Sequence, residues 1–120
     1  MDEIPSLFRL AKNVSKLSPH RVRLGAVIVK NGHPISVAHN QTKSNPHAPY
    51  CGLHAETNAI RYAGKIDLRG ASIFVYRENR RNQISLARPC KHCLEELRQR
   101  GFKYMWYTTS EYPYFDCERI

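Results

Sequence analysis

Residues 22–39, VRLGAVIVKNGHPISVAH, contain the pattern that decides the fold. The first nine residues are rich in β-branched side chains and continuously apolar over 26–29, which is typical of a buried strand. Asn31-Gly32 is the dipeptide that a two-residue hairpin turn favours, because both turn positions need a positive φ. Residues 35–39 then predict the returning strand. The stretch therefore predicts an antiparallel hairpin that opens a sheet.

Helices and further strands are predicted on both sides of this hairpin. Residues 4–17 carry apolar side chains at three- and four-residue steps, the spacing of one stripe of an amphipathic helix. The other predicted elements are helices over 54–63 and 90–100, strands over 72–77 and 102–108, and a final edge strand within the last dozen residues. Because two strand–helix–strand steps occur in this order, we expect parallel neighbouring strands in a central sheet with helices on its faces.

Length and composition favour one ordinary globular domain, residues 1–120, that is 42% hydrophobic and 24% charged. The N-terminus has no basic and apolar leader pattern, and the longest apolar stretch is too short to span a bilayer. We therefore expect a cytoplasmic protein without a membrane partner. Nineteen Lys and Arg against ten Asp and Glu give a net charge of +9, which favours anionic partners such as nucleotides or nucleic acid.

Two short motifs carry the chemistry: His54-Ala55-Glu56 and Pro89-Cys90-Lys91-His92-Cys93. His54, Cys90 and Cys93 supply three zinc ligands, and three protein ligands leave the fourth tetrahedral position open for water, as in catalytic zinc sites. Side chains two residues apart lie on nearly opposite faces within a helix, so His54 and Glu56 can share a site only in a first turn. We therefore expect two helix N-termini to converge on one metal ion.

A closed structural zinc site is the alternative interpretation of these cysteines. Cys51 and His54 followed by Cys90 and Cys93 can be read as C-x-x-H…C-x-x-C, four ligands of a non-catalytic module that binds nucleic acid. This interpretation assigns no role to Glu56. If it is wrong, Cys51 is expected to be an unreactive thiol.

The order H-x-E…P-C-x-x-C, within RLGAVIV, LHAETNAI and ARPCKHC, resembles the cytidine and deoxycytidylate deaminase superfamily. The resemblance implies an α/β fold, a three-layer α/β/α sandwich with a mixed five-stranded sheet whose fifth strand returns antiparallel. It also implies Zn²⁺ on His54, Cys90 and Cys93, zinc-activated water, and Glu56 as the proton shuttle. By the same mapping Asn40 binds the sugar, although Asn is also common in turns after strands, and the backbone N–H of Ala55 holds the pyrimidine carbonyl.

This resemblance predicts hydrolytic deamination of a free cytosine nucleoside or nucleotide (cytidine, deoxycytidine or dCMP) to the uracil product and ammonia. The alternative within catalysis is deamination of cytosine or adenine in single-stranded DNA or RNA, which needs a groove of cationic and aromatic side chains. Compact relatives complete their sites with neighbouring subunits, so a homo-oligomer is expected.

Residues 40–53 form a loop too long to be a mere connector, and we expect this loop to determine the substrate. Lys43 and His47 are its best candidates to contact a phosphate or sugar. Arg88 could contact a substrate phosphate or a neighbouring subunit, or do neither, and His92 is expected to be a bystander.

Overall fold

The computed structural model describes residues 5–19, 21–40 and 54–120, and every predicted helix and strand is found there. The elements are α1 (Leu7–Ser15), β1 (Arg23–Lys30), β2 (His33–His39), α2 (Ala55–Ala63), β3 (Ser72–Glu78), α3 (Lys91–Gln99), β4 (Tyr104–Thr108) and β5 (Phe115–Arg119). The first helix is shorter than the apolar stripe predicted. It ends at Ser15, and Leu17, the last side chain of that stripe, is 70% exposed.

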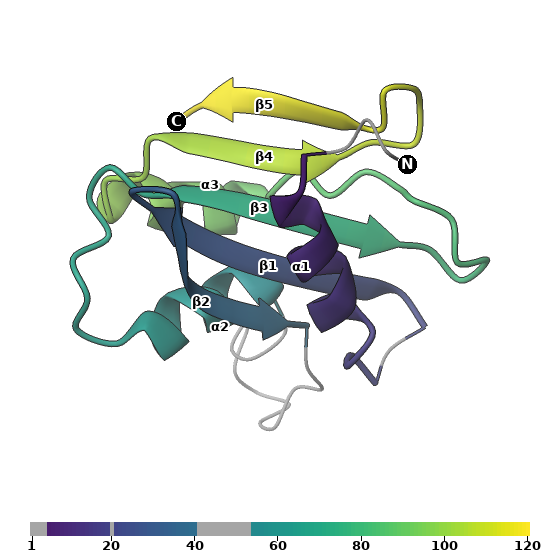
Figure 1. The fold of residues 1–120 in the computed structure, drawn as a ribbon, viewed down its shortest axis with the longest axis horizontal. Coiled ribbons are helices and arrows are strands. Elements are labelled where there is room, and N and C mark those ends of the chain that lie inside the picture. Colours follow the sequence, from purple (N-terminus) through teal and green to yellow (C-terminus); the bar gives the residue numbers. More distant parts are fainter. Residues whose placement is uncertain (1–4, 20, 41–53) are drawn as a thin grey trace.

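The described strands form one mixed five-stranded sheet with the order β2-β1-β3-β4-β5 (Figure 1). β1 pairs antiparallel with both β2 and β3, β3 pairs parallel with β4, and β5 returns antiparallel to β4 as predicted. The prediction of parallel neighbours was wrong for the first strand–helix–strand step. β2 and β3 do run in the same direction, but β1 lies between them, because the connection through α2 passes over the hairpin's first strand.

The turn of the opening hairpin has the predicted backbone. Asn31 and Gly32 both adopt positive φ, 53° and 77°, and the flanking pair Lys30 and His33 lie opposite each other. The register shifts by one residue between Ile28 and Val29, so the hairpin carries a bulge close to its turn. This tight connection aligns β1 and β2 before any helix packs on them.

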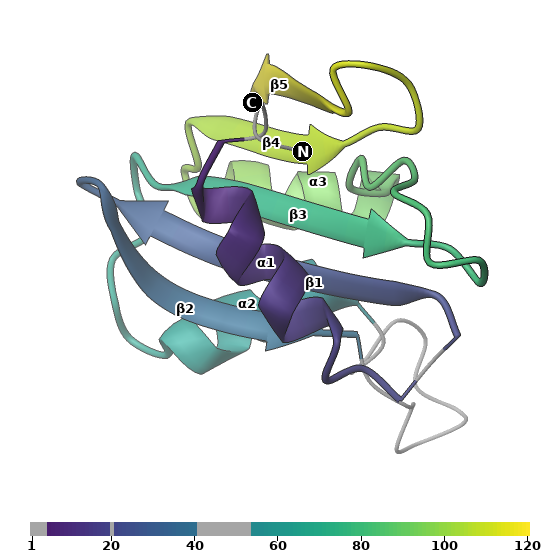
Figure 2. The ribbon, with the colours of Figure 1, turned by 45° about the vertical axis from the view of Figure 1, so that its right-hand side comes forward.

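The three helices divide between the two faces of the sheet (Figure 2). α1 packs on one face, where Phe8 and Ala11 join a core that includes Val27 and Phe74. The other face meets α2 and α3 in a second core. The protein is therefore the three-layer α/β/α sandwich that the sequence predicted.

Gly25 shows why this strand needs a glycine. A Cβ built there would lie 2.0 Å from the carbonyl oxygen of Ala11 and 2.8 Å from the backbone nitrogen of Ser15. Any larger residue would therefore push α1 off β1, because both close atoms belong to the α1 backbone.

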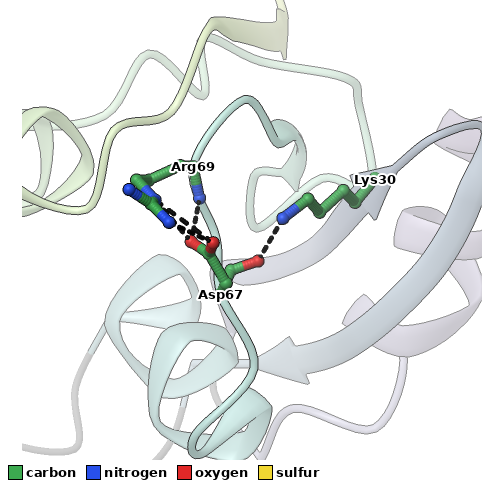
Figure 3. Close-up of polar contacts among 3 residues, drawn as sticks. All are labelled: Lys30, Asp67 and Arg69. Atoms are coloured by element: carbon green, nitrogen blue, oxygen red, sulfur yellow. Dashed lines mark hydrogen bonds and ion pairs between the residues drawn. The ribbon is translucent and has the colours of Figure 1, made fainter.

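The strands begin and end along two opposite sides of the sheet, and these two sides differ in structure. At one edge, where β1 ends and β3 begins, Lys30 donates to the carbonyl of Asp67 at 2.6 Å, and Asp67 forms a two-pronged ion pair with Arg69 (Figure 3). The hydrogen bonds from Arg69 lower the pKa of Asp67. At the opposite edge β1 begins, β3 and β4 end, and the predicted ligands lie. No helix in the described part of the chain is long and apolar enough to cross a bilayer.

Candidate functional site

His54 stands at the start of α2, where the chain changes from extended to helical backbone. It is the N-cap residue, with φ −94° and ψ 134°, and Glu56 lies in the first helical turn. His54 is partly exposed, whereas Ala55 and Glu56 are buried. His54 and Glu56 therefore lie at a helix start and in its first turn, the placement that their two-residue spacing predicted.

Cys90 occupies the equivalent place at the start of α3. It is the N-cap residue with an extended backbone, φ −68° and ψ 168°, and Cys93 lies one turn further along. Pro89, directly before it, is fully buried and fixes the approach of the chain. Cys90 is exposed and Cys93 is 1% exposed, so the Cys90 thiol lies at the protein surface and the Cys93 thiol lies in the interior.

The three predicted ligands come together in space. The ligand atoms of His54, Cys90 and Cys93 all lie within 4.8 Å of one another, and Cys90 Sγ is 4.0 Å from His54 Nδ1. Two thiols and one imidazole are a donor set that zinc prefers, and a set of three leaves one tetrahedral position for water or substrate. The residues present therefore fit a zinc ion.

The electrostatics of the ligands also fit a cation. Partial burial and, to a lesser extent, the charge of His92 lower the pKa of His54, which favours the neutral imidazole that a metal needs. Burial and the carboxylate of Glu56 raise the pKa of Cys93. A thiol in such surroundings becomes a thiolate when a metal ion supplies the compensating charge.

Glu56 is a buried carboxyl beside these ligands. It is 3% exposed, and its Oε1 atom has no hydrogen-bond partner among the described residues. Burial raises the pKa of Glu56, an effect that its own backbone N–H and the Cys93 side chain partly oppose. An unpaired polar atom in such a place costs about 1–3 kcal/mol, which is typical of a group kept for chemistry rather than stability.

The sequence of residues 1–109 matches the family model described as the cytidine and deoxycytidylate deaminase zinc-binding region. The chain belongs to this deaminase family. The match spans both helix starts, and the three residues positioned to bind a metal ion, His54, Cys90 and Cys93, lie within it. No curated protein matches the chain significantly in sequence.

Solved deaminase structures have the same fold. The dCMP deaminase of cyanophage S-TIM5 in complex with dCMP and dUMP is 26% identical, with a TM-score of 0.66 over 87% of this chain and 79% of that one. Its apo form is 24% identical, with a TM-score of 0.65 over 88% and 86%. The diaminohydroxyphosphoribosylaminopyrimidine deaminase/5-amino-6-(5-phosphoribosylamino)uracil reductase of Thermotoga maritima is 25% identical. Its TM-score is 0.53, over 80% of this chain and 26% of that larger one.

Asn40 lies at the end of β2, and its side chain is already engaged with the backbone before and within β1. Its Oδ1 accepts from the backbone N–H of Leu24 at 3.0 Å, and its Nδ2 donates to the carbonyl of Val22 at 2.9 Å. It therefore holds the start of β1 against the end of β2 in this deaminase. Lys43, His47 and Cys51 lie outside the described residues.

Sequence reasoning missed the contacts that hold the segment before Cys90. Arg88 donates to both carboxylate oxygens of Glu118 on β5, at 2.7 and 3.2 Å, and so has a partner within its own chain. Thr108, at the end of β4, hydrogen-bonds to the backbone of Ser85. No short-range pattern links these residues, which lie more than 20 positions apart. His92 is exposed and is not part of the ligand cluster, in line with the expectation of a bystander.

Proposed function

We propose that residues 1–120 form one zinc-dependent deaminase domain that acts on a free cytosine nucleotide, with dCMP as the leading substrate. The reaction replaces the exocyclic amine of cytosine by oxygen from water: the C4–N bond breaks, a C4–O bond forms, and the uracil product and ammonia leave. The observation that carries this proposal is the buried, partly unpaired carboxyl of Glu56 beside a cluster of two thiols and one imidazole.

In this proposal His54, Cys90 and Cys93 hold the zinc ion. Zinc, when bound, supplies a Lewis acid that makes water a nucleophile at neutral pH. Glu56 takes the proton that the attacking water loses and delivers it to the ring nitrogen N3. It then takes the second proton, from the new hydroxyl on C4, and passes it to the exocyclic amine, which leaves as ammonia while the C4 carbonyl forms. Its burial keeps bulk water away from that transfer. Its carboxyl also interacts with the side chain of Cys93, so it lies beside a proposed ligand, where a proton carrier is needed.

Backbone and loop groups would orient the substrate. Ala55 is the first residue of α2, and a helix's first N–H groups have no acceptor within the helix, which supports a contact from this N–H to the pyrimidine carbonyl. Asn40 keeps one amide hydrogen beyond the bond that it donates to Val22, and that hydrogen could reach the sugar. Lys43 and His47 are proposed to contact the sugar or phosphate.

The choice of a monophosphate has two supports. The solved relative at 26% identity was crystallised with dCMP and dUMP, and the present chain carries a net charge of +9. A basic protein attracts an anionic nucleotide more strongly than a neutral nucleoside, most of all at low salt.

The test is ammonia release from a substrate panel by the zinc-loaded protein. The panel contains dCMP, CMP, deoxycytidine, cytidine, the purine monophosphates and a cytosine-containing single-stranded oligonucleotide. We expect the highest kcat/KM on dCMP, loss of turnover after chelation, and recovery when zinc is restored. Turnover of the oligonucleotide but not of dCMP would contradict the proposed substrate class, and no turnover of any cytosine compound would contradict the deaminase proposal itself.

A further inference from the structure

Residues 85–88, here called the bracing segment, form the later part of the connection from β3, which ends at Glu78, to the helix start that carries Cys90. Backbone and side-chain hydrogen bonds fix this segment at several points. The hydroxyl of Thr108 donates to the carbonyl of Ser85 at 2.8 Å and accepts from the backbone N–H of Arg77 at 3.1 Å. The N–H of Ala87 donates to the carbonyl of Thr108 at 2.9 Å. The end of β4 therefore fixes the bracing segment at Ser85 and Ala87.

The last residue of the bracing segment is attached to β5. The guanidinium of Arg88 donates two hydrogen bonds to the carboxylate of Glu118, at 2.7 and 3.2 Å. The hydroxyl of Tyr107, on β4, donates to the same carboxylate. Glu118 thus has partners on two sides, which fixes its carboxylate in one place and makes it a firmer anchor than an ordinary exposed ion pair.

Cys90 is held on one side by α3, whose Leu94 N–H donates to the Cys90 carbonyl at 2.8 Å, and on the other side by the residues that precede it. It is exposed, and its side chain makes no capping hydrogen bond to α3. Between Arg88 and Cys90 stands Pro89, which is fully buried and has a restricted backbone. With one restricted residue between them, we expect a displacement of Arg88 to shift the backbone that places the Cys90 thiol.

We propose that Glu118 is a positioning residue for the metal centre: through Arg88 it sets the place of Cys90, so the last strand controls how tightly zinc is held. The inference rests on the proposed assignment of Cys90 as a ligand. β5 spans Phe115–Arg119 and lies beyond residues 1–109, the part that matches the family model, so the family match does not describe this support.

The experiment measures the rate at which the zinc-loaded full chain loses zinc to excess 4-(2-pyridylazo)resorcinol at neutral pH. We expect Glu118→Gln to release zinc up to about tenfold faster than wild type, because Glu118 acts through Arg88 and is less direct than a partner bonded to a ligand, whose loss costs about 10–100-fold in affinity. Tyr107→Phe, which removes the hydrogen bond from the Tyr107 hydroxyl to Glu118 and leaves both bonds from Arg88, should give a smaller increase in the same direction. The double variant Arg88→Glu, Glu118→Arg restores the pair with reversed charges and should bring the rate back toward wild type.

The matched control is Asp67→Asn, which breaks the other two-pronged Arg–carboxylate pair, at the opposite edge of the sheet (Figure 3). It should leave zinc release unchanged. A role of Glu118 in stability alone would lower the unfolding midpoint without changing zinc release at 25 °C, so both are measured on each variant.

Zinc release at the wild-type rate from folded Glu118→Gln would overturn the proposal, as would an equal increase in Asp67→Asn. If Glu118→Gln fails to fold, Tyr107→Phe decides: an unchanged rate in that variant contradicts the proposal. A Cys90→Ser protein that holds zinc as tightly as wild type would show instead that the ligand assignment is wrong.

Discussion

At the start of α2, the residues that follow His54 are buried from Ala55 to Ile60, whereas at the start of α3, Cys90, Lys91 and His92 are exposed and Cys93 is buried. Both helix starts supply ligands to one cluster. The first is embedded in the core beneath the sheet, and the second lies at the margin of that core. Both helix starts therefore place candidate metal ligands, but the α2 start is more deeply buried than the α3 start.

The difference lies in what supports each helix start in addition to the core that α2 and α3 share. Apolar burial around Ala55 and Ala59 holds the α2 start, and burial of this kind has no directional preference. α3 is also buried, at Leu97, and the segment before it is held in addition by the bond that Thr108 donates to Ser85 and the bonds that Arg88 donates to Glu118. Hydrogen bonds are directional, so loss of one partner displaces the other. Variants that remove one support at a time test this contrast.

The largest effect is expected when a ligand is removed from either half. His54→Ala and Cys90→Ser should each lower zinc affinity by more than the 10–100-fold that loss of an outer-shell partner costs. Two remaining ligands cannot surround the ion in the tetrahedral geometry of protein zinc sites. Metal content after dialysis against a weak chelator should fall from one zinc per chain to near zero.

Cys51→Ser is the companion variant for this prediction. It should keep one zinc per chain, because a three-ligand catalytic centre does not use that thiol. Loss of zinc from Cys51→Ser would favour the closed four-ligand site and would contradict the contrast between two ligand-bearing helix starts.

The next effect concerns the support of the α3 half. Thr108→Val removes the acceptor for the N–H of Arg77 and the donor to the carbonyl of Ser85, and Thr108 is fully buried. Two unpaired groups on half-buried residues should lower the free energy of unfolding by about 2 kcal/mol, the lower end of the cost of about 1–3 kcal/mol for each fully buried group. Urea unfolding of the zinc-free protein measures this loss, and zinc release should accelerate in the same variant.

Ser36→Ala is the matched change for the α2 half. Its hydroxyl donates to the carbonyl of Ala59 at 2.6 Å, so the variant removes a single hydrogen bond beneath α2. We expect a loss of about 1 kcal/mol and unchanged zinc release. Faster zinc loss in Ser36→Ala than in Thr108→Val would reverse the contrast between the two halves.

The smallest effect is expected for Cys90→Ser in the zinc-free protein, with Cys93→Ser as its comparison. Cys93→Ser should lower the free energy of unfolding by about 1–2 kcal/mol, because a more polar group replaces a buried thiol. Cys90→Ser should change it by less than about 0.5 kcal/mol, since this thiol is exposed. Equal losses in the two variants would mean that burial does not distinguish the helix starts.

Local patterns in the sequence predicted every helix and strand and the ligand-bearing ends of α2 and α3. Asn31-Gly32 predicted the hairpin turn because the preference of these residues for positive φ is local. The two-residue spacing of His54 and Glu56 predicted a helix start at that point. The neighbours of β3 were not predictable in this way. A crossover step predicts the relative direction of β2 and β3, and the position of β1 between them depends on packing of the whole sheet.

The contacts that hold the segment before Cys90 could not be predicted from the sequence, for a related reason. Thr108 and Glu118 are ordinary polar residues of strands, and no spacing rule connects them to Ser85 or Arg88. Their contacts arise only when β4 and β5 join the sheet beside β3. Residues that bind a ligand directly tend to form motifs, whereas residues that hold those motifs in place are recognised from the fold.

The most direct test compares wild-type protein and Glu56→Gln for zinc content and for ammonia release from dCMP. Both proteins should hold one zinc per chain, because Glu56 is no ligand in the proposed centre. Wild type should convert dCMP to dUMP with one ammonia per product, and Glu56→Gln should be about 10²–10⁴-fold slower, the usual contribution of a general acid–base group. Equal turnover by the two zinc-loaded proteins would contradict the proposed role of Glu56, and loss of zinc from Glu56→Gln would contradict the three-ligand centre.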